Sequence, residues 1–182
     1  MGPPPIIRTE GCGTIGPACG PGTFGSVIPA ASVRVVEAAR LFGLEIAVTS
    51  FPEGTKTAVD AAAAIGCPVA AIVKSLVFVV DTEPVVALVP GDRRLDPVKL
   101  AAACGGGEVR RATLDEVRDA TGFVAGGTPP FGHSRKLRVF ADRALARHEP
   151  VWAAAGTPNT VFPIGPVDLL AATGGTWSDL SS

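Results

Sequence analysis

Histidine, methionine and tyrosine are scarce in this sequence: two histidines, one methionine and no tyrosine occur among 182 residues. A metal centre built on several histidines is therefore not expected. Cysteine is also sparse, and no pair of cysteines has the CxxC spacing of a zinc or redox motif. We expect no metal, no cofactor and four reduced thiols, namely Cys12, Cys19, Cys67 and Cys104.

Long apolar runs and an excess of one charge are missing as well. No stretch of about eighteen apolar residues occurs, which argues against a membrane-spanning helix. The N-terminus lacks a basic region followed by an unbroken apolar core, so no secretory signal is predicted. The formal net charge of −1 excludes a global field that attracts nucleic acid. We expect a soluble, cytoplasmic protein that meets any polyanion through a local patch.

The composition predicts one globular domain with two loose ends. Apolar residues make up 47% of the chain and charged residues 18%, and the length suffices for a substantial core. Residues 1–29 are rich in glycine and proline and poor in large apolar side chains, which indicates a flexible leader. We place the domain at residues 30–176 and expect residues 177–182 to form a loose C-terminal tail.

Helices and short strands are predicted to alternate irregularly along the domain. This order favours a mixed α/β domain with a curved, partly antiparallel sheet and helices packed outside it. Helices are expected over residues 32–43, 57–65, 96–105, 113–122 and 166–172, and strands over residues 44–49, 70–80, 85–89, 137–140, 151–155 and 160–164.

One lysine interrupts the apolar run AAIVKSLVFVV at residues 70–80. A run rich in valine, isoleucine and phenylalanine predicts a strand buried on both faces. The ammonium of Lys74 would lose hydration there unless it had a partner or a wet cleft. Lys74 therefore points either into a site or out of an edge of the sheet, where its head would reach water.

A second feature is the loop GGTPPFGH at residues 126–133. Glycines let backbone N–H groups approach a ligand closely, and the consecutive prolines Pro129 and Pro130 restrict the loop to few shapes. Exposed amides beside a lone lysine favour a site for an anion or a polarised carbonyl.

With both features in view, the sequence resembles the YbaK family of prolyl-tRNA editing domains, which stand alone or are inserted in prolyl-tRNA synthetases. The resemblance depends on IVKSLVF, on the upstream segment TAVDAAAAIG, and on ATGFVAGGTPPFGH, in which Gly126 and Pro130 match the family's GxxxP loop. It covers about residues 32–172. It implies a barrel-like mixed sheet surrounded by helices.

The resemblance also implies an activity and its partners. Members of this family hydrolyse the ester that joins a wrong amino acid, such as alanine or cysteine, to tRNA, chiefly to tRNA(Pro). We therefore expect a trans-editing aminoacyl-tRNA deacylase that acts on aminoacyl-tRNA, with a prolyl-tRNA synthetase as a second partner. The resemblance places the general base on the substrate, either the ribose hydroxyl beside the ester or a substrate thiol.

The expected catalytic residues are Lys74, Gly126, Gly127, Thr128 and Pro130. Lys74 would supply charge to the terminal adenosine phosphate or to the developing oxyanion, and the loop N–H groups would orient the aminoacyl carbonyl. The expected substrate-binding residues are Phe51, Thr57, Pro129, Gly132, His133 and Ala154.

Two of these substrate-binding residues carry an alternative, and a third departs from the family's pattern. His133 could shuttle a proton or bind phosphate, or be a solvated bystander. Phe51 either lines the amino-acid pocket or belongs to the core. Ala154 stands where some cysteine-removing members have a serine, so the sequence does not indicate cysteine specificity.

Basic side chains outside the motifs could meet the acceptor stem, or could be a solvated face. They are Arg93, Arg94, Arg135, Lys136 and Arg138. Two other functions stay open: a module of the same fold that binds aminoacyl-tRNA or a protein partner without catalysis, and a lysine enzyme that forms a Schiff base.

Overall fold

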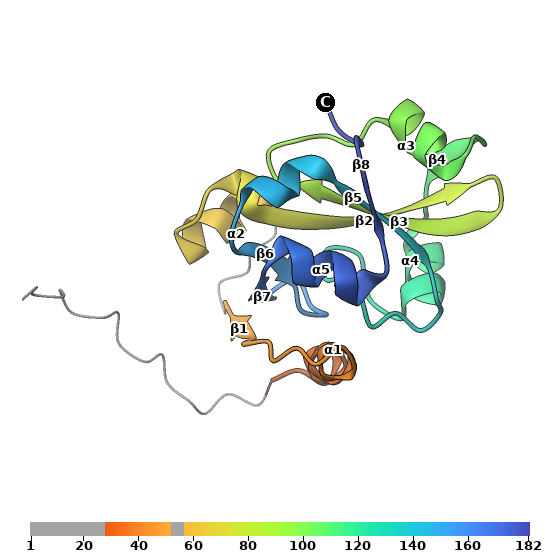
Figure 1. The fold of residues 1–182 in the computed structure, drawn as a ribbon. Coiled ribbons are helices and arrows are strands. Elements are labelled where there is room, and N and C mark those ends of the chain that lie inside the picture. Colours follow the sequence, from red (N-terminus) through yellow and green to blue (C-terminus); the bar gives the residue numbers. More distant parts are fainter. Residues whose placement is uncertain (1–27, 52–56) are drawn as a thin grey trace, which may run out of the picture.

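The computed structural model of the protein describes residues 28–51 and 57–182, so most of the predicted leader lies outside the described residues. The described residues form one mixed sheet with helices around it (Figure 1). The strands are β1 (Thr49–Ser50), β2 (Ile72–Val80), β3 (Glu83–Pro90), β4 (Val109–Arg111), β5 (Arg138–Asp142), β6 (Val151–Ala154), β7 (Thr160–Ile164) and β8 (Thr176–Ser178). The helices are α1 (Ala30–Leu41), α2 (Ala58–Ile65), α3 (Pro97–Cys104), α4 (Leu114–Thr121) and α5 (Pro166–Thr173), with short 3-10 helices η1 (Val69–Ala71) and η2 (Arg143–Arg147).

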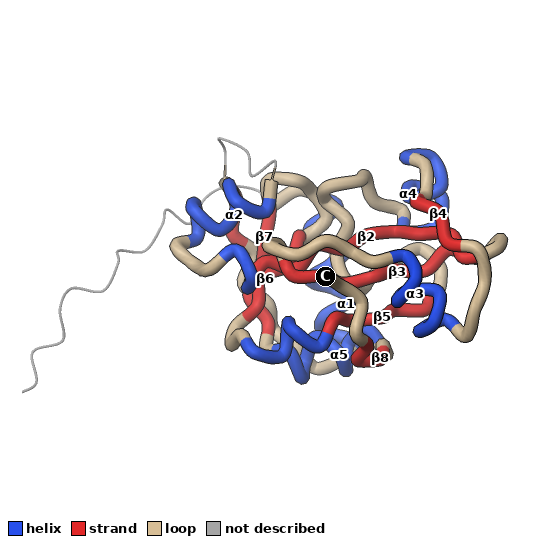
Figure 2. Tube along the Cα trace, turned by 90° about the horizontal axis from the view of Figure 1, so that it is seen from above, coloured by secondary structure: helices blue, strands red, loops and turns tan. Residues whose placement is uncertain are grey.

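Strand β2, which contains the lysine, lies in the middle of the sheet. The strand order is β1-β7-β6-β2-β3-β5-β8, and β4 also pairs with β2. Strands β2 and β3 form an antiparallel hairpin, whereas β2–β6, β3–β5 and β5–β8 are parallel. Figure 2 shows β2, β3 and β5 side by side. The predicted mixed α/β fold with a partly antiparallel sheet is confirmed.

Strand β3 is buried on both faces because helices cover each side of the sheet. Val86 and Leu88 point into a cluster with α1 and α5, and Val85, Ala87 and Val89 point into a second cluster with α3. This alternation follows from the two-residue period of a strand. A strand covered on both faces has a continuous apolar sequence. The sequence predicts such burial for β2, which has it only in part, because Lys74, Ser75, Leu76 and Phe78 are half-buried.

The helix boundaries follow local chemistry that is visible in the sequence. Thr57 and Thr113 each form a capping box at the start of α2 and α4. Asp96 caps α3, which has Pro97 in its first turn. Four of the helices end at a glycine in the left-handed conformation, at Gly66, Gly105, Gly122 and Gly174.

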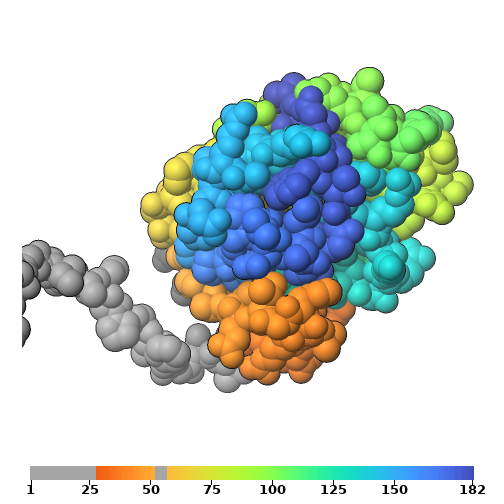
Figure 3. Space-filling model, viewed as in Figure 1, coloured from red at the N-terminus to blue at the C-terminus, as the bar shows by residue number. Residues whose placement is uncertain are grey.

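Two predictions for the N-terminal part of the domain are wrong. The helix predicted over residues 32–43 begins and ends earlier, because α1 spans Ala30–Leu41. Ser32 lies inside it, and its buried hydroxyl donates to Thr160 Oγ1 at 3.2 Å. Residues 44–49 are not a full strand, because only Thr49–Ser50 pair with β7. Their apolar side chains still pack on the core, which is enough to produce an alternating pattern. Figure 3 shows α1 packed against the C-terminal part of the chain.

The prediction of a loose tail at residues 177–182 is also wrong. Trp177 belongs to β8, which pairs with β5, and Leu180 is fully buried. The polar composition of this segment indicated a tail, but one apolar side chain that fits the core anchors the segment. Strand β4 was not predicted, because a three-residue strand with two exposed arginines has no apolar pattern.

Candidate functional site

A pocket of about 300 Å³ lies where α2, β2, β6, β7 and the glycine-proline loop meet. Five of the eleven predicted site residues line it: Lys74, Gly126, Thr128, Thr57 and Ala154. The pocket lies at the beginning of β2, next to the point where β2 runs parallel to β6. The strand and the loop that the sequence singled out therefore form one site.

Lys74 is half-buried, and backbone oxygens hold its ammonium. Its Nζ donates to the carbonyl of Gly91 at 3.2 Å and to the carbonyl of Arg93, both in the loop between β3 and α3. An ammonium has three N–H donors. Within the described residues, two donors are occupied, which leaves one for a ligand in the pocket.

Burial lowers the pKa of Lys74 from its ordinary value. The nearby carboxylate of Asp92 opposes this shift, and the positive charge of Arg94 adds to it. The two carbonyl acceptors make the charged form tolerable in a mostly apolar wall. Lys74 is thus a fixed cation at the pocket rather than a freely moving surface lysine.

The start of the glycine-proline loop is a tight turn pressed against the turn between β6 and β7. Gly126 has a φ of +86°, in the left-handed region that favours glycine. The N–H of Gly127 donates to the carbonyl of Val124 at 3.1 Å. A Cβ on Gly127 would lie 2.6 Å from the Cα of Thr157, so only glycine fits there.

This geometry leaves fewer backbone N–H groups of the loop available to a ligand. The N–H of Gly127 is already used inside the loop, whereas the N–H groups of Gly126 and Thr128 have no partner among the described residues. The Thr128 side chain is occupied, since its hydroxyl donates to the carbonyl of Val124 at 3.2 Å. Gly126 and Thr128 are the loop residues that line the pocket.

The rest of the loop is a buried support. Pro129 and Pro130 are buried, and Gly132, with a φ of +79°, packs against α1. His133 Nε2 donates to the carbonyl of Pro129 at 2.8 Å. Burial lowers the pKa of His133, which favours the neutral form of the ring. His133 closes the loop on itself, and it does not line the pocket.

The remaining predicted residues differ in how close they lie to the pocket. Thr57 lines its edge, although its hydroxyl is also engaged in capping α2. Ala154 contributes a small apolar wall. Phe51 does not line the pocket: its backbone N–H donates to the carbonyl of Asn159 at the end of β1.

The structure adds three polar pocket residues that the sequence analysis did not select: Ser75, Arg111 and Thr160. Arg111 comes from β4, and Thr160 receives a hydrogen bond from Ser32. The Ser75 hydroxyl oxygen is buried without a partner among the described residues. A desolvated hydroxyl in a pocket wall would gain a partner from a polar ligand.

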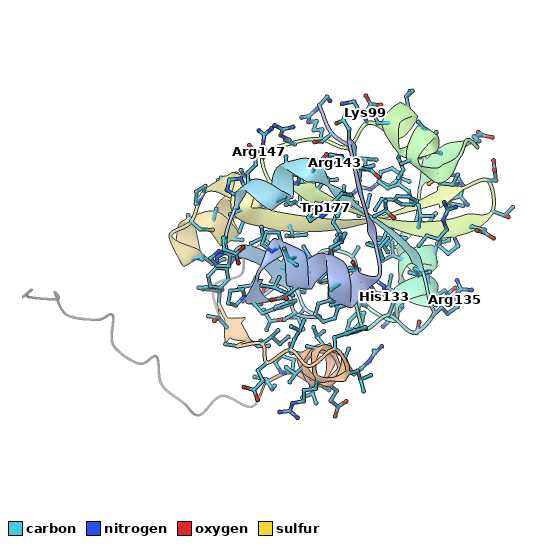
Figure 4. All side chains as sticks on the ribbon, viewed as in Figure 1. Lys99, His133, Arg135, Arg143, Arg147 and Trp177 are labelled. Carbon is cyan, nitrogen blue, oxygen red and sulfur yellow. The ribbon has the colours of Figure 1, made fainter. Side chains whose placement is uncertain are left out.

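The predicted basic patch does not form one surface. Arg135, Lys136 and Arg138 line a separate groove with residues 82–84, which shares no residue with the Lys74 pocket. Figure 4 shows Arg135 on the same side of the molecule as His133. Arg93 and Arg94, in contrast, belong to the loop that holds Lys74.

Residues 28–51 and 57–182 contain no cluster of metal-binding side chains. No group of three or more His, Cys, Asp or Glu side chains in these ranges could hold a metal ion. No helix in the same ranges is long and apolar enough to cross a membrane.

The fold and the pocket agree with known proteins. Residues 52–172 match the family described as the aminoacyl-tRNA editing domain. The chain therefore belongs to this family, and the resemblance drawn from its motifs is confirmed. A crystal structure described provisionally as a trans-editing enzyme for prolyl tRNA synthetase is 41% identical, with a TM-score of 0.82, over 86% of this chain and 99% of that chain.

Relatives occur both as similar-sized proteins and as parts of larger enzymes. EbsC of Enterococcus faecalis, named provisionally as a Cys-tRNA(Pro)/Cys-tRNA(Cys) deacylase, is 28% identical over 73% of this chain and 82% of its own length. YwhH of Bacillus subtilis is 32% identical over 67% of this chain and 78% of its own length. The proline–tRNA ligase of Nitratidesulfovibrio vulgaris is 42% identical over 50% of this chain, which spans only 16% of that ligase.

Proposed function

We propose that this editing domain acts in trans as an aminoacyl-tRNA deacylase, which hydrolyses the ester of a small mischarged amino acid on tRNA(Pro). The observation that carries this proposal is the half-buried Lys74 ammonium, which has one donor left and lines the same pocket as Gly126 and Thr128. A prolyl-tRNA synthetase is the expected functional partner, and the cytoplasm is the expected compartment.

The reaction needs stabilisation of negative charge more than it needs a protein base. Water attacks the ester carbonyl, and the carbonyl oxygen becomes an oxyanion. The bond to the ribose oxygen then breaks, and the proton lost by the attacking water passes to that oxygen, which releases the amino acid and tRNA. Lys74 and the N–H groups of Gly126 and Thr128 supply positive charge and donors for the oxyanion or the adjoining phosphate. The family resemblance implies that the general base belongs to the substrate, and we assign this role to the ribose hydroxyl beside the ester.

The pocket suits a small amino acid. Its volume of about 300 Å³ is at the low end for ligand sites, and Ala58, Ala61 and Ala154 form part of its wall. The partnerless hydroxyl of Ser75 would pair with a polar group of the substrate. Alanine and cysteine are both accommodated by this description, since one heavy atom in an apolar pocket changes binding by only about 1–3 kcal/mol.

The decisive experiment measures release of amino acid from tRNA(Pro) charged with alanine, cysteine, serine or proline. We expect wild type to clear at least one mischarged species and to leave Pro-tRNA(Pro) intact, and Lys74→Ala to clear none. If wild type binds these tRNAs without releasing any amino acid, the domain is a binding module and the proposal fails.

A further inference from the structure

The loop that holds Lys74 is itself held from its other side by the C-terminal segment. Residues 91–95 connect β3 to α3, and the carbonyls of Gly91 and Arg93 accept the hydrogen bonds of the lysine. The next residues pair with the end of the chain. Leu95 and Ser181 form an antiparallel bridge, and the Ser182 N–H donates to the carbonyl of Arg94 at 3.2 Å.

A further backbone bond extends this pairing into the start of α3. The Asp96 N–H donates to the carbonyl of Leu180 at 2.8 Å. Residues 94–96 and 180–182 therefore behave as two short paired segments. Because Arg93 directly precedes this pairing, any shift of the C-terminal segment moves the carbonyl that receives the Lys74 hydrogen bond.

The C-terminal segment is anchored in the core rather than at the surface. The Asp142 carboxylate, 2% exposed, accepts from the Leu180 N–H at 3.0 Å and from the Ser181 hydroxyl at 2.7 Å. Its other oxygen accepts from the Ala144 N–H at 2.8 Å. Leu180 is fully buried against the cluster that contains Leu100. A buried carboxylate is stable only when its oxygens are satisfied in this way.

Lys99, in α3, also binds the C-terminal segment. Its Nζ donates to the carbonyl of Ser181 at 2.8 Å and pairs with Asp179 at 3.0 Å. Figure 4 labels Lys99 beside the C-terminal end of the chain, above the sheet. The anchor thus joins β5, α3 and the C-terminal segment into one assembly next to the lysine loop.

We propose that residues 180–182, anchored by Asp142, position Lys74 for the reaction by fixing the loop whose carbonyls orient its ammonium. Asp142 and Leu180 are positioning residues, since neither lines the pocket. This inference rests on the proposed function for its catalytic consequence. Its structural part, that the anchor fixes the ammonium, stands on the contacts alone.

The first test observes the ammonium directly by NMR, with no need for activity. The full chain contains four lysines, so ¹⁵N-lysine labelling gives few signals, and Lys74→Arg assigns the one of interest. In wild type, we expect the hydrogen-bonded Lys74 ammonium to exchange slowly with water and to be visible. In Leu180→Ala and Asp142→Asn, we expect fast exchange and loss of that signal.

The second test measures deacylation by the same variants. We expect kcat to fall about ten- to a hundredfold with little change in KM, because a displaced ammonium affects the reacting state more than binding. Val35→Ala, a core truncation in α1, is the control for lost stability. It should keep the signal and the kcat of wild type.

Clear results would overturn the inference. An unchanged Lys74 signal and kcat in folded Leu180→Ala and Asp142→Asn would do so, as would equal losses in Val35→Ala. If both anchor variants fail to fold, Ser181→Ala, which removes one hydroxyl, decides by the same two readouts. If wild type has no deacylase activity but the NMR signals behave as expected, the proposed function fails and the positioning role stands.

Discussion

Two loops present backbone groups of opposite polarity, the first to Lys74 and the second to the pocket that Lys74 lines. The loop at residues 91–95 points carbonyl oxygens at Lys74, whereas the loop at residues 126–132 leaves the N–H groups of Gly126 and Thr128 without a partner in the described chain. The first loop fixes a cation, and the second can receive an anion or a carbonyl oxygen. A site without a carboxylate in its described wall can thus combine backbone N–H groups with the positive charge of Lys74.

Both loops contain a close-packed glycine, but different contacts hold each loop in place. Each contains a glycine whose missing Cβ allows close packing: a Cβ on Gly91 would lie 2.4 Å from the Val69 carbonyl, and one on Gly127 would lie 2.6 Å from Thr157 Cα. The first loop is then held by the C-terminal segment, and the second by the His133 ring. The first loop is held by a segment distant in sequence, residues 180–182, and the second by a hydrogen bond within the loop.

The largest expected effect comes from removing Lys74, the side chain through which the first loop acts on the pocket. Lys74→Ala should lower kcat by about 10²–10³ or more, because a preorganised donor to the oxyanion is lost. The thermal midpoint should change little, since removing a half-buried cation also removes its desolvation cost. Single-turnover deacylation and thermal unfolding check both statements, with the exposed Lys136→Ala as control. Activity near that of wild type in Lys74→Ala would contradict the assignment.

A pH profile tests whether the first loop holds a charged lysine. Burial lowers the pKa of Lys74, so its proton is lost at a lower pH than the value of about 10.4 for a free lysine side chain. Deacylation should fall about tenfold per pH unit above that lowered pKa, after correction for spontaneous ester hydrolysis. Asp92→Asn removes the carboxylate that opposes the shift, so it should move the fall to lower pH. In Lys74→Arg, any residual activity should not show this fall at high pH.

The two close-packed glycines provide a matched pair. Gly91→Ala and Gly127→Ala should each lose about 1–3 kcal/mol of stability from overpacking, and each should reduce kcat because its loop must shift. Gly66→Ala is the control, because Gly66 has a left-handed φ of +79° but a Cβ added there would meet nothing within 4 Å. It should cost about 1 kcal/mol from the backbone alone and keep kcat. Equal kcat in all three variants would refute the importance of close packing.

The sequence could predict the chemistry of the second loop better than that of the first. Glycines and prolines in GGTPPFGH indicate a fixed loop directly, and Lys74 is conspicuous in an apolar strand. The acceptors of Lys74 are main-chain oxygens of Gly91 and Arg93, which carry no residue-specific pattern. Their role depends on where the chain folds back after β3.

The sequence also could not predict the residues that reach the pocket only through strand pairing. Arg111 reaches the pocket because β4 pairs with β2, and Ser75 because its strand forms the wall. The anchor at Leu180 was missed because one apolar residue among serines and an aspartate has no periodicity. In contrast, the caps at Thr57, Asp96 and Thr113 depend on neighbours within three residues, so the helix starts were predicted well.

Substitutions of His133, whose ring holds the second loop through one hydrogen bond, should have a smaller effect. His133→Gln can keep a donor toward the Pro129 carbonyl, whereas His133→Ala loses it. We expect His133→Ala to cost about 1 kcal/mol of stability and His133→Gln less. Both should retain most of the kcat of wild type, because the ring does not line the pocket. A large loss of kcat in stable His133→Gln would instead assign the ring a role in catalysis.

The smallest expected effects come from substituting single arginines, and they should differ between an arginine at the pocket and one outside it. Arg111 lines the pocket, whereas Arg135 lines the other groove. If Arg111 meets a phosphate near the tRNA 3′ end, Arg111→Gln should weaken tRNA binding a few-fold and make the slope of log K against log salt shallower by about 0.7, the value for one single-strand contact. Arg135→Gln should leave the slope for a short acceptor-stem RNA unchanged. Equal slopes for both variants and wild type would show that Arg111 contacts no phosphate, and a change with Arg135→Gln alone would place the RNA across the other groove.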